Sequence, residues 1–437
     1  MASNQNQIST RMAAIVKALE PITSATGEVH KAHPNDIKFG DGENKLMQSK
    51  MIDVCKDAMA KSISMKTFAN PNGFEGDETL KQAFASYFNT YFNPSIPVES
   101  EHIVPTAGSG NALESLLCTI CDAGDSVLCP APAWRAYGFF GMFHAGISII
   151  PAYVETTSQS WWVDSMSLSV IAALEKAYTS APDSHKIKAV LISNPSNPFA
   201  RCWPEDVLRE MAKFCNKYGL HFISDEVFAN TAFHPQDEKF TSMLSVLHSQ
   251  EAIADEDFST TTESQDTIDS SRVHIVWSMS KDFGACGVRS GCAMTYNPLV
   301  RSGVSYASFW QISSLTAHFT TAVLTSPLTP SWVSDTKTQL RNLHNLCRDI
   351  LVVPELSGRL EILPANAGFW VNAIVTLREG ETTKDIVVRA RTNHILIDVG
   401  NDFGRFLGER QGEFKITFSK EEGVLRAGLE RLKESLV

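Results

Sequence analysis

The sequence contains no apolar run as long as the roughly 18 residues that a helix needs to cross a bilayer. It also has no excess of positive charge, because 38 Lys and Arg stand against 49 Asp and Glu, a net charge of −11. The absence of a long apolar run argues against a membrane protein. The negative net charge argues against non-specific binding to nucleic acid or to an anionic membrane surface. The apolar content of 43% and charged content of 20% exclude a disordered, collagen-like or coiled-coil chain.

The N-terminal residues lack the long apolar core of a secretory signal, and the nine cysteines are scattered through apolar segments. We therefore expect reduced, buried thiols in a cytoplasmic protein, since a chain of this size needs no disulfide framework. Cys118 and Cys121 form a C-x-x-C, but no second cysteine pair or nearby His completes a zinc set. We interpret the pair as part of a core helix, and we predict no metal site.

The middle of the chain alternates short runs rich in Val and Ile with helical patterns. Such runs are typical of buried strands, and a sheet built from strand–helix repeats is mainly parallel with helices on both faces. In such α/β folds the ligand site lies beyond the carboxyl ends of the strands. The predicted strands are 102–106, 126–130, 188–193, 221–224 and 273–278, and a helix is predicted over 204–219.

Two segments depart from this alternation. Residues 251–270 contain seven acids, seven Ser or Thr and no Lys or Arg, which favours a solvated insertion over a regulatory phosphosite. After about residue 325 two prolines precede a helical pattern over 331–352, and the remaining residues are typical of a second α/β unit.

Polar residues follow four predicted strands. Each residue alone has an ordinary explanation as a turn, a helix cap or a surface lysine. Together they match the needs of a phosphate group, which binds backbone N–H groups at a helix N-terminus, hydroxyl groups and a cation. The residues that could supply these contacts are Gly108, Ser109, Ser278, Ser280 and Arg289.

The same strand ends carry groups that suit a pyridoxal ring. Asp225 can keep a pyridinium nitrogen protonated, and Asn197 can donate to a phenolate oxygen. Lys281 can form a Schiff base with an aldehyde, and Trp134 can stack on the ring face. The sequence therefore predicts a pyridoxal 5'-phosphate site.

These motifs, in this order, resemble the fold type I pyridoxal-phosphate enzymes of the class I/II aminotransferase family, and within it the 1-aminocyclopropane-1-carboxylate synthase branch. The similar stretches are GENKL (42–46), NGFEGDETLKQAFASYF (72–88), AGSGNALESLL (107–117) and SMSKDFGACGVRSG (278–291). The resemblance implies a three-layer large domain with a mainly parallel sheet, a smaller α/β domain, and a homodimer with active sites at the interface. It also implies that Glu43 helps to recognise the substrate.

On this basis we divide the chain into three parts. Residues 1–55 are an N-terminal segment of the small domain, 56–325 are the large cofactor-binding domain, and 326–437 are the C-terminal small domain.

Three positions depart from the family pattern. Phe228 stands where the family often has a Tyr that bonds the cofactor phenolate. Phe74 stands where the ring-forming synthases carry a Tyr that reaches across the dimer, and Phe cannot transfer a proton. Lys415, in EFKITF, stands where the family binds the substrate α-carboxylate with Arg, so the two-point fork is lost. Arg405 or Arg410 could substitute, the alignment could be displaced, or the substrate could lack an α-carboxylate.

The leading hypothesis is an aminotransferase acting on an amino acid or amine in specialised biosynthesis, with Lys281 moving the Cα proton. The alternative is a C–S or other carbon–heteroatom lyase or cyclase of the same branch. A regulator that binds the cofactor without turnover is a third hypothesis, against which the complete set of cofactor residues counts. An aromatic substrate pocket could come from Trp161 and Trp162 or, as we favour, from Phe369 and Trp370.

Overall fold

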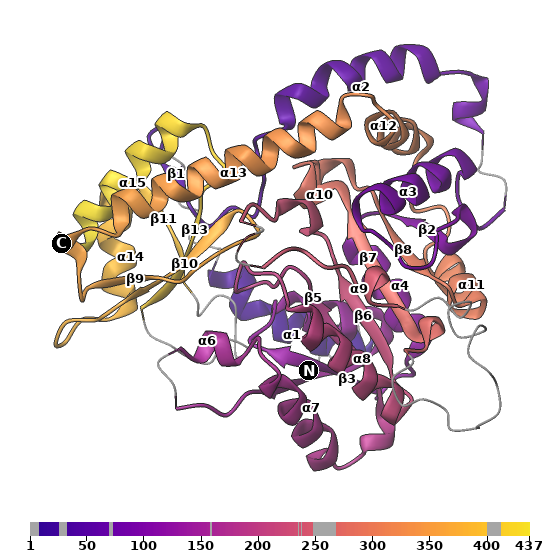
Figure 1. The fold of residues 1–437 in the computed structure, drawn as a ribbon, viewed down its shortest axis with the longest axis horizontal. Coiled ribbons are helices and arrows are strands. Elements are labelled where there is room, and N and C mark those ends of the chain that lie inside the picture. Colours follow the sequence, from indigo (N-terminus) through magenta and orange to yellow (C-terminus); the bar gives the residue numbers. More distant parts are fainter. Residues whose placement is uncertain are drawn as a thin grey trace, which may run out of the picture.

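The computed structural model describes residues 8–25, 33–69, 73–157, 160–234, 236, 238–247, 268–399 and 412–437. A seven-stranded sheet in the order β2-β8-β7-β6-β5-β3-β4 forms its centre (Figure 1). Only β8 runs against the other strands of this sheet, so the sheet is mixed but mostly parallel. The strands are β2 (Ile103–Thr106), β3 (Ser126–Ala131), β4 (Ser148–Tyr153), β5 (Ile187–Ser193), β6 (His221–Asp225), β7 (Val273–Ser278) and β8 (Gly291–Thr295).

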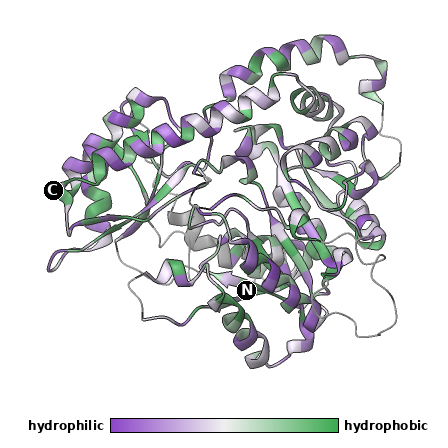
Figure 2. Cartoon of the chain, viewed as in Figure 1, coloured by the Kyte–Doolittle hydropathy of each residue, from purple (hydrophilic) through white to green (hydrophobic). Residues whose placement is uncertain are grey.

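Helices cover both faces of this sheet, which confirms the predicted three-layer α/β architecture. Along β5 the side chains alternate: Val190 and Ile192 pack in one core, whereas Ala189 and Leu191 pack in the other. Figure 2 shows the hydrophobic colouring of the central strands between the two helical layers. One core is completed by α3 (Glu78–Tyr91), α7 (Ser169–Ser180) and α8 (Glu205–Tyr218), the other by α4 (Ser109–Ile120) and α11 (Pro298–Ala307).

The predicted helix at 204–219 is α8, and Gly219 ends it with a left-handed φ of +66°. Two strands of the seven-stranded sheet, β4 and β8, were not predicted. Six of the nine cysteines are buried, as expected, but Cys55 and Cys286 are half-buried and Cys118 is exposed. The expectation of buried thiols was therefore wrong at Cys118, because that residue lies on the outer face of α4 and not on its core face.

A second unit follows the long helix α13 (Thr329–Leu351), which runs from the large unit toward the C-terminus in Figure 1. Its antiparallel sheet has the order β12-β13-β10-β9, and α13, α14 (Thr383–Thr392) and α15 (Glu422–Leu436) accompany it. The strands are β9 (Leu360–Ile362), β10 (Trp370–Val375), β12 (Asp398–Val399) and β13 (Glu413–Thr417), with β11 (Ile395–Leu396) beside them.

The N-terminal segment is shared between the two units. β1 (Ile37–Lys38) pairs with β11, and Phe39 is buried in the core of the C-terminal unit. Met51, on α2 (Gln48–Ser62), packs instead in the core of the large unit, where α2 lies against α12 (Ser314–Leu324). The domain boundaries themselves stay a prediction, and most of the acidic insertion lies outside the described residues. The remaining helices are α1 (Thr10–Ala25), α5 (Ala136–Phe140), α6 (Trp161–Asp164), α9 (Met243–Val246) and α10 (Met279–Asp282).

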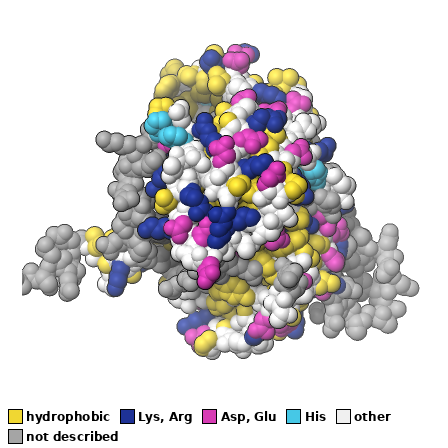
Figure 3. Space-filling model, turned by 90° about the vertical axis from the view of Figure 1, so that its left-hand side faces the viewer, with side chains coloured by type: hydrophobic (Ala, Val, Ile, Leu, Met, Phe, Trp, Pro, Cys, Tyr) yellow, Lys and Arg dark blue, Asp and Glu magenta, His cyan; other side chains and the backbone are white. Residues whose placement is uncertain are grey.

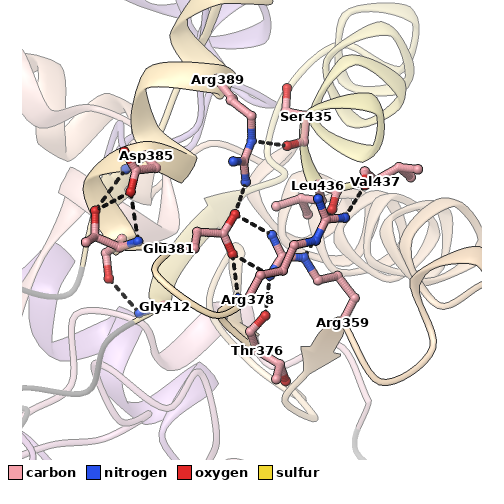
Figure 4. Close-up of polar contacts among 12 residues, drawn as sticks. Arg359, Thr376, Arg378, Glu381, Asp385, Arg389, Gly412, Ser435, Leu436 and Val437 are labelled. Carbon is pink, nitrogen blue, oxygen red and sulfur yellow. Dashed lines mark hydrogen bonds and ion pairs between the residues drawn. The ribbon is translucent and has the colours of Figure 1, made fainter.

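An ion-pair network closes the C-terminal unit (Figure 4). Glu381 accepts hydrogen bonds from Arg359 and Arg389, and its side chain is only 7% exposed. Each arginine also donates to a backbone carbonyl at the end of α15: Arg359 to Leu436 and Arg389 to Ser435. These contacts attach α15 to β9 and α14.

The face that carries the C-terminal unit shows acidic and basic side chains interspersed (Figure 3). Among the described residues, no helix is both long enough and apolar enough to span a membrane.

Candidate active site

A cavity opens at the carboxyl ends of the parallel strands, where the C-terminal unit meets the large sheet. Its walls come from the segment after β1, from the start of α4, from the ends of β3, β5 and β6 and the residues that follow them, from α10, and from β10 and β13. This is the place that the α/β pattern predicts for a ligand site. The lining residues are Gly40, Gly42, Ser109, Trp134, Tyr137, Ser193, Asn197, Asp225, Val227, Phe228, Lys281, Phe369, Trp370, Lys415 and Thr417.

Lys281 enters the cavity from the short helix α10, directly after β7. Ser278 caps this helix, its hydroxyl accepting the N–H of Ser280. The Lys281 Nζ donates a hydrogen bond of 2.6 Å to the carbonyl oxygen of Gly42. Among the described residues that line the cavity, one other lysine, Lys415 on β13, carries an amine.

Asp225, the last residue of β6, is buried beside the cavity at 5% exposure. Burial raises the pKa of its carboxyl group to about 6, although a hydrogen bond from Tyr137 opposes this rise. The Tyr137 hydroxyl donates to Asp225 Oδ2 at 2.9 Å, and the N–H of Val227 donates to Oδ1. A fixed carboxylate at this position can stabilise a positive charge in the cavity.

The start of α4 and the loop after α10 form a cradle suited to an anion. Gly108, with φ +85°, is the N-cap residue of α4, so the free N–H groups of the first helical turn begin beside it. The Ser109 and Ser278 hydroxyl oxygens are 3.4 Å apart. Arg289 donates to the carbonyl of Ala107 at 3.0 Å, and a Cβ atom added at Gly108 would lie 2.4 Å from Arg289 Nη2.

Asn197 and Lys415 meet on the opposite wall. The Lys415 Nζ donates to Asn197 Oδ1 at 2.6 Å and lies 4.8 Å from the centre of the Trp370 ring. The amide oxygen of Asn197 is thus engaged, which leaves its NH₂ group as the donor available to a ligand. The structure places Lys415 in the cavity.

Aromatic side chains form the rest of this wall. Phe228 makes edge-to-face contacts with Phe369 and Trp370 at ring separations of 5.7 and 5.0 Å. The Trp370 Nε1–H donates to the carbonyl of Pro198, which fixes the indole. Trp134 also lines the cavity and contacts Tyr137 edge to face.

Several predicted site residues lie elsewhere. Trp161 packs on Phe199 and Trp162 lies near Arg201, both outside the lining of the cavity. Glu43 follows the lining residue Gly42, but its side chain is exposed. Phe74 is 50% exposed and contacts Tyr306 and Phe309, away from the cavity of its own chain. Arg405 and Arg410, the possible substitutes for Lys415, lie outside the described residues.

Sequence reasoning missed Tyr137, which bonds Asp225, and Gly42, which bonds Lys281. A signal for Tyr137 was available, because it follows Trp134 by one helical turn after a predicted strand. Gly42 carried no such signal, because its contribution is a backbone carbonyl whose direction the sequence does not show.

Comparisons with known proteins show the family to which the chain belongs. The sequence profile of the family described as "Aminotransferase class I and II" matches residues 34–432. The chain is 31% identical to "Probable aminotransferase aclI" of Aspergillus oryzae, over 100% of this chain and 99% of the relative. It is 29% identical to "Probable aminotransferase sirI" of Leptosphaeria maculans, over 94% of each chain. It is 26% identical to 1-aminocyclopropane-1-carboxylate synthase 2 of Solanum lycopersicum, over 92% of this chain and 80% of the relative.

The fold is also found in solved structures. An aspartate aminotransferase of Thermus thermophilus superimposes with a TM-score of 0.72 at 18% identity, covering 99% of this chain and 100% of the other. An aromatic aminotransferase of Pyrococcus horikoshii gives a TM-score of 0.70 at 20% identity, covering 94% and 97%.

Proposed function

We propose that this chain, which belongs to the aminotransferase class I and II family, uses pyridoxal 5'-phosphate to move an amino group from an amino acid or amine to an oxo acid. One observation carries the proposal: Lys281 and the buried carboxylate of Asp225 line the same cavity at the carboxyl ends of the strands. Family membership supports an aminotransferase, and this pair of residues supports the choice of cofactor.

The residues that line the cavity and those beside it fit that cofactor. The cradle of Gly108, Ser109, Ser278 and Arg289 offers N–H groups, hydroxyls and a cation, which a phosphate requires. Arg289 approaches Gly108 so closely that a Cβ atom would fill the cradle. Ser280, 7% exposed, lies in the first turn of α10 beside this cradle.

The chemistry that pyridoxal phosphate supplies when bound is an aldehyde for amines and a pyridinium ring that withdraws electrons from Cα. Asp225 would hold the pyridinium proton, Asn197 would donate from its NH₂ group, and Trp134 would cover the ring face. The amine of Lys281 would take the proton from Cα and return it at another carbon. Lys415 would attract the substrate carboxylate as a single ammonium, without the fork of an arginine. Phe228 offers no hydroxyl group.

The test is a reaction of the purified chain with pyridoxal phosphate, a panel of amino acids and amines, and an oxo acid. We expect a new amino acid from the oxo acid, no free ammonia, and no product with Lys281→Ala. Lys176→Ala, which changes an exposed lysine on α7, is the matched control and should retain activity. No change in the cofactor spectrum and no product with any donor would refute the proposal.

A lyase of the same family is the second candidate, because 1-aminocyclopropane-1-carboxylate synthases are among the relatives. Release of ammonia or of a leaving group in the same experiment would favour it. Phe74 counts against ring formation, since its side chain has no group that transfers a proton.

We further propose a homodimer in the cytoplasm. The dimer is supported by exposed apolar side chains on η1 (Met65–Phe68), at Phe74 and on α11. On η1, Met65 is 91% and Phe68 82% exposed. A surface of this kind marks a contact with another protein. The resemblance to the ring-forming synthases implies that Phe74 would reach across such a dimer. Sedimentation velocity tests the dimer, and a monomer at micromolar concentration would refute it.

A further inference from the structure

We propose that Asn44 is a positioning residue for Lys281 and that it acts together with the backbone carbonyl of Gly42. This inference rests on the proposed function, because it presumes that Lys281 is the reacting amine. The two residues lie in one segment, residues 41–44, which we call the strap. The strap passes between the C-terminal unit and the helix α10, which carries Lys281, and no role for Asn44 follows from the chemistry described so far.

Asn44 bonds the backbone of Lys281 itself. Its Nδ2 donates to the carbonyl oxygen of Lys281 at 3.2 Å, and its Oδ1 accepts the N–H of Leu46 at 3.2 Å. The side chain is completely buried. Because one end of the amide faces a carbonyl group and the other faces an N–H group, only one orientation of Asn44 satisfies both contacts.

The strap and the loop after Lys281 touch at a point that leaves no room for a side chain. Gly284 has φ +65°, and a Cβ atom added there would lie 1.8 Å from the carbonyl oxygen of Asn44. Only glycine permits both this backbone conformation and this close approach. The side chain of Asn44 is thus held by its hydrogen bonds to Lys281 and Leu46, and its backbone is held against Gly284.

The C-terminal unit holds the other side of the strap. The Thr417 hydroxyl donates to the carbonyl of Asp41 at 2.9 Å, and the Ser419 hydroxyl donates to the carbonyl of Glu43 at 2.8 Å. Lys420 forms an ion pair of 2.7 Å with the Asp41 carboxylate. The carbonyls of residues 41 and 43 are therefore occupied by the C-terminal unit. The carbonyl between them, at Gly42, accepts the Lys281 Nζ at 2.6 Å.

The strap thus fixes Lys281 at both ends. Asn44 holds the backbone of Lys281, and Gly42 holds its amino group. Between these two points lies a flexible chain of four methylenes, which loses rotamer entropy when it is ordered. An amine that is held in advance reaches Cα in the correct position more often. We expect loss of Asn44 to lower kcat while substrate affinity changes little, because the strap residue Asn44 does not line the cavity.

The first experiment compares Asn44→Ala with Gln48→Ala in the holoenzyme. Gln48 is the matched control. Its Nε2 also donates a hydrogen bond of 3.2 Å to a backbone carbonyl, but this carbonyl belongs to Gly284, in the loop after α10, and not to Lys281. We expect kcat to fall about tenfold or more in Asn44→Ala, with KM changed less than about twofold, and both constants to be retained in Gln48→Ala. An equal fall of kcat in both variants would overturn the proposal.

The second experiment needs no turnover. The apo chain is treated with an amine-selective acylating reagent, and the modification of Lys281 is followed by peptide mass spectrometry. We expect Lys281 to react several-fold faster in Asn44→Ala than in the wild type and in Gln48→Ala, because its Nζ is no longer held on Gly42. An unchanged rate would refute the positioning role. If the wild type shows no transamination but this difference appears, the proposed function fails and the positioning role stands.

If Asn44→Ala does not fold, Asn44→Asp takes its place in both experiments. It keeps the acceptor for the N–H of Leu46 and removes the NH₂ group that bonds Lys281. A thermal unfolding curve of each variant separates a loss of stability from a loss of positioning.

Discussion

The Lys415 Nζ donates a 2.6 Å hydrogen bond to Asn197 Oδ1, which joins β13 of the C-terminal unit to the loop after β5 of the large sheet. The group that we propose to bind substrate and the group that we propose to bind cofactor are thus in direct contact. Any ligand that attracts Lys415 therefore acts on Asn197 as well, and occupancy of the cavity affects both units.

Substitution of Lys415 with alanine tests whether this residue binds the substrate. We expect KM for amino acids with a free carboxylate to rise about tenfold or more, because a charged hydrogen bond in a partly buried site is lost. Lys415→Arg is the control and should keep most of the affinity, since the charge remains. Steady-state kinetics measure both. Unchanged affinity in Lys415→Ala would exclude Lys415 from the substrate site.

The buried carboxylate of Asp225 should make the uptake of the cofactor depend on pH. Burial raises its pKa to about 6, so the group is neutral below that pH and charged above it. Uptake of pyridoxal phosphate by the apo chain should therefore weaken as the pH falls through about 6, and Asp225→Asn should abolish this dependence. At pH 8 we expect Asp225→Asn to lower the amino-transfer rate about 10²- to 10³-fold, the range for removal of one preorganised electrostatic group.

Tyr137→Phe refines the same measurement. The hydroxyl of Tyr137 donates to Asp225 and lowers its pKa, so its removal should move the midpoint of cofactor uptake to higher pH. A titration of uptake by absorbance measures the midpoint. A midpoint that stays in place would show that Asp225 does not control uptake.

Gly108→Ala should weaken cofactor binding about tenfold or more, because phosphate contacts are charge-assisted and the new Cβ atom would displace Arg289. Gly124→Ala provides the control: its φ of +93° imposes similar backbone strain, but nothing lies within 4 Å of its Cβ position. Equilibrium dialysis gives Kd for both. Equal weakening in the two variants would point to strain and not to the cradle.

Glu381→Ala should destabilise the C-terminal unit by about 2–3 kcal/mol, because it leaves Arg359 without its partner at a site where only 11% of that arginine is exposed. Glu422→Ala removes an exposed pair with Arg426 and should cost less than about 0.5 kcal/mol. Denaturant unfolding at pH 7 measures the difference. Similar values for the two variants would show that the network in Figure 4 contributes little.

The sequence by itself determined the large fold and the closeness of the groups that we propose to bind the cofactor. Strands such as 188–193 are apolar on both faces, and this pattern requires helices on both sides. Parallel strands bring their carboxyl ends to one edge, so Asn197, Asp225 and Lys281 had to lie near one another. Their place in the chain therefore indicated their place in space.

Only the tertiary structure decided the contacts made across the two units. The pairing of Lys415 with Asn197 spans 218 positions in the chain, and that of Lys281 with Gly42 spans 239. β8 was missed because it runs antiparallel to β7 and β2. It therefore does not belong to the strand–helix repeat from which the parallel strands were predicted. Gly42 acts through a backbone carbonyl, and Asn44 through an orientation imposed by Gly284 and Leu46. A pattern of residue types records which groups are available, whereas the packing of two units fixes the direction in which each group points.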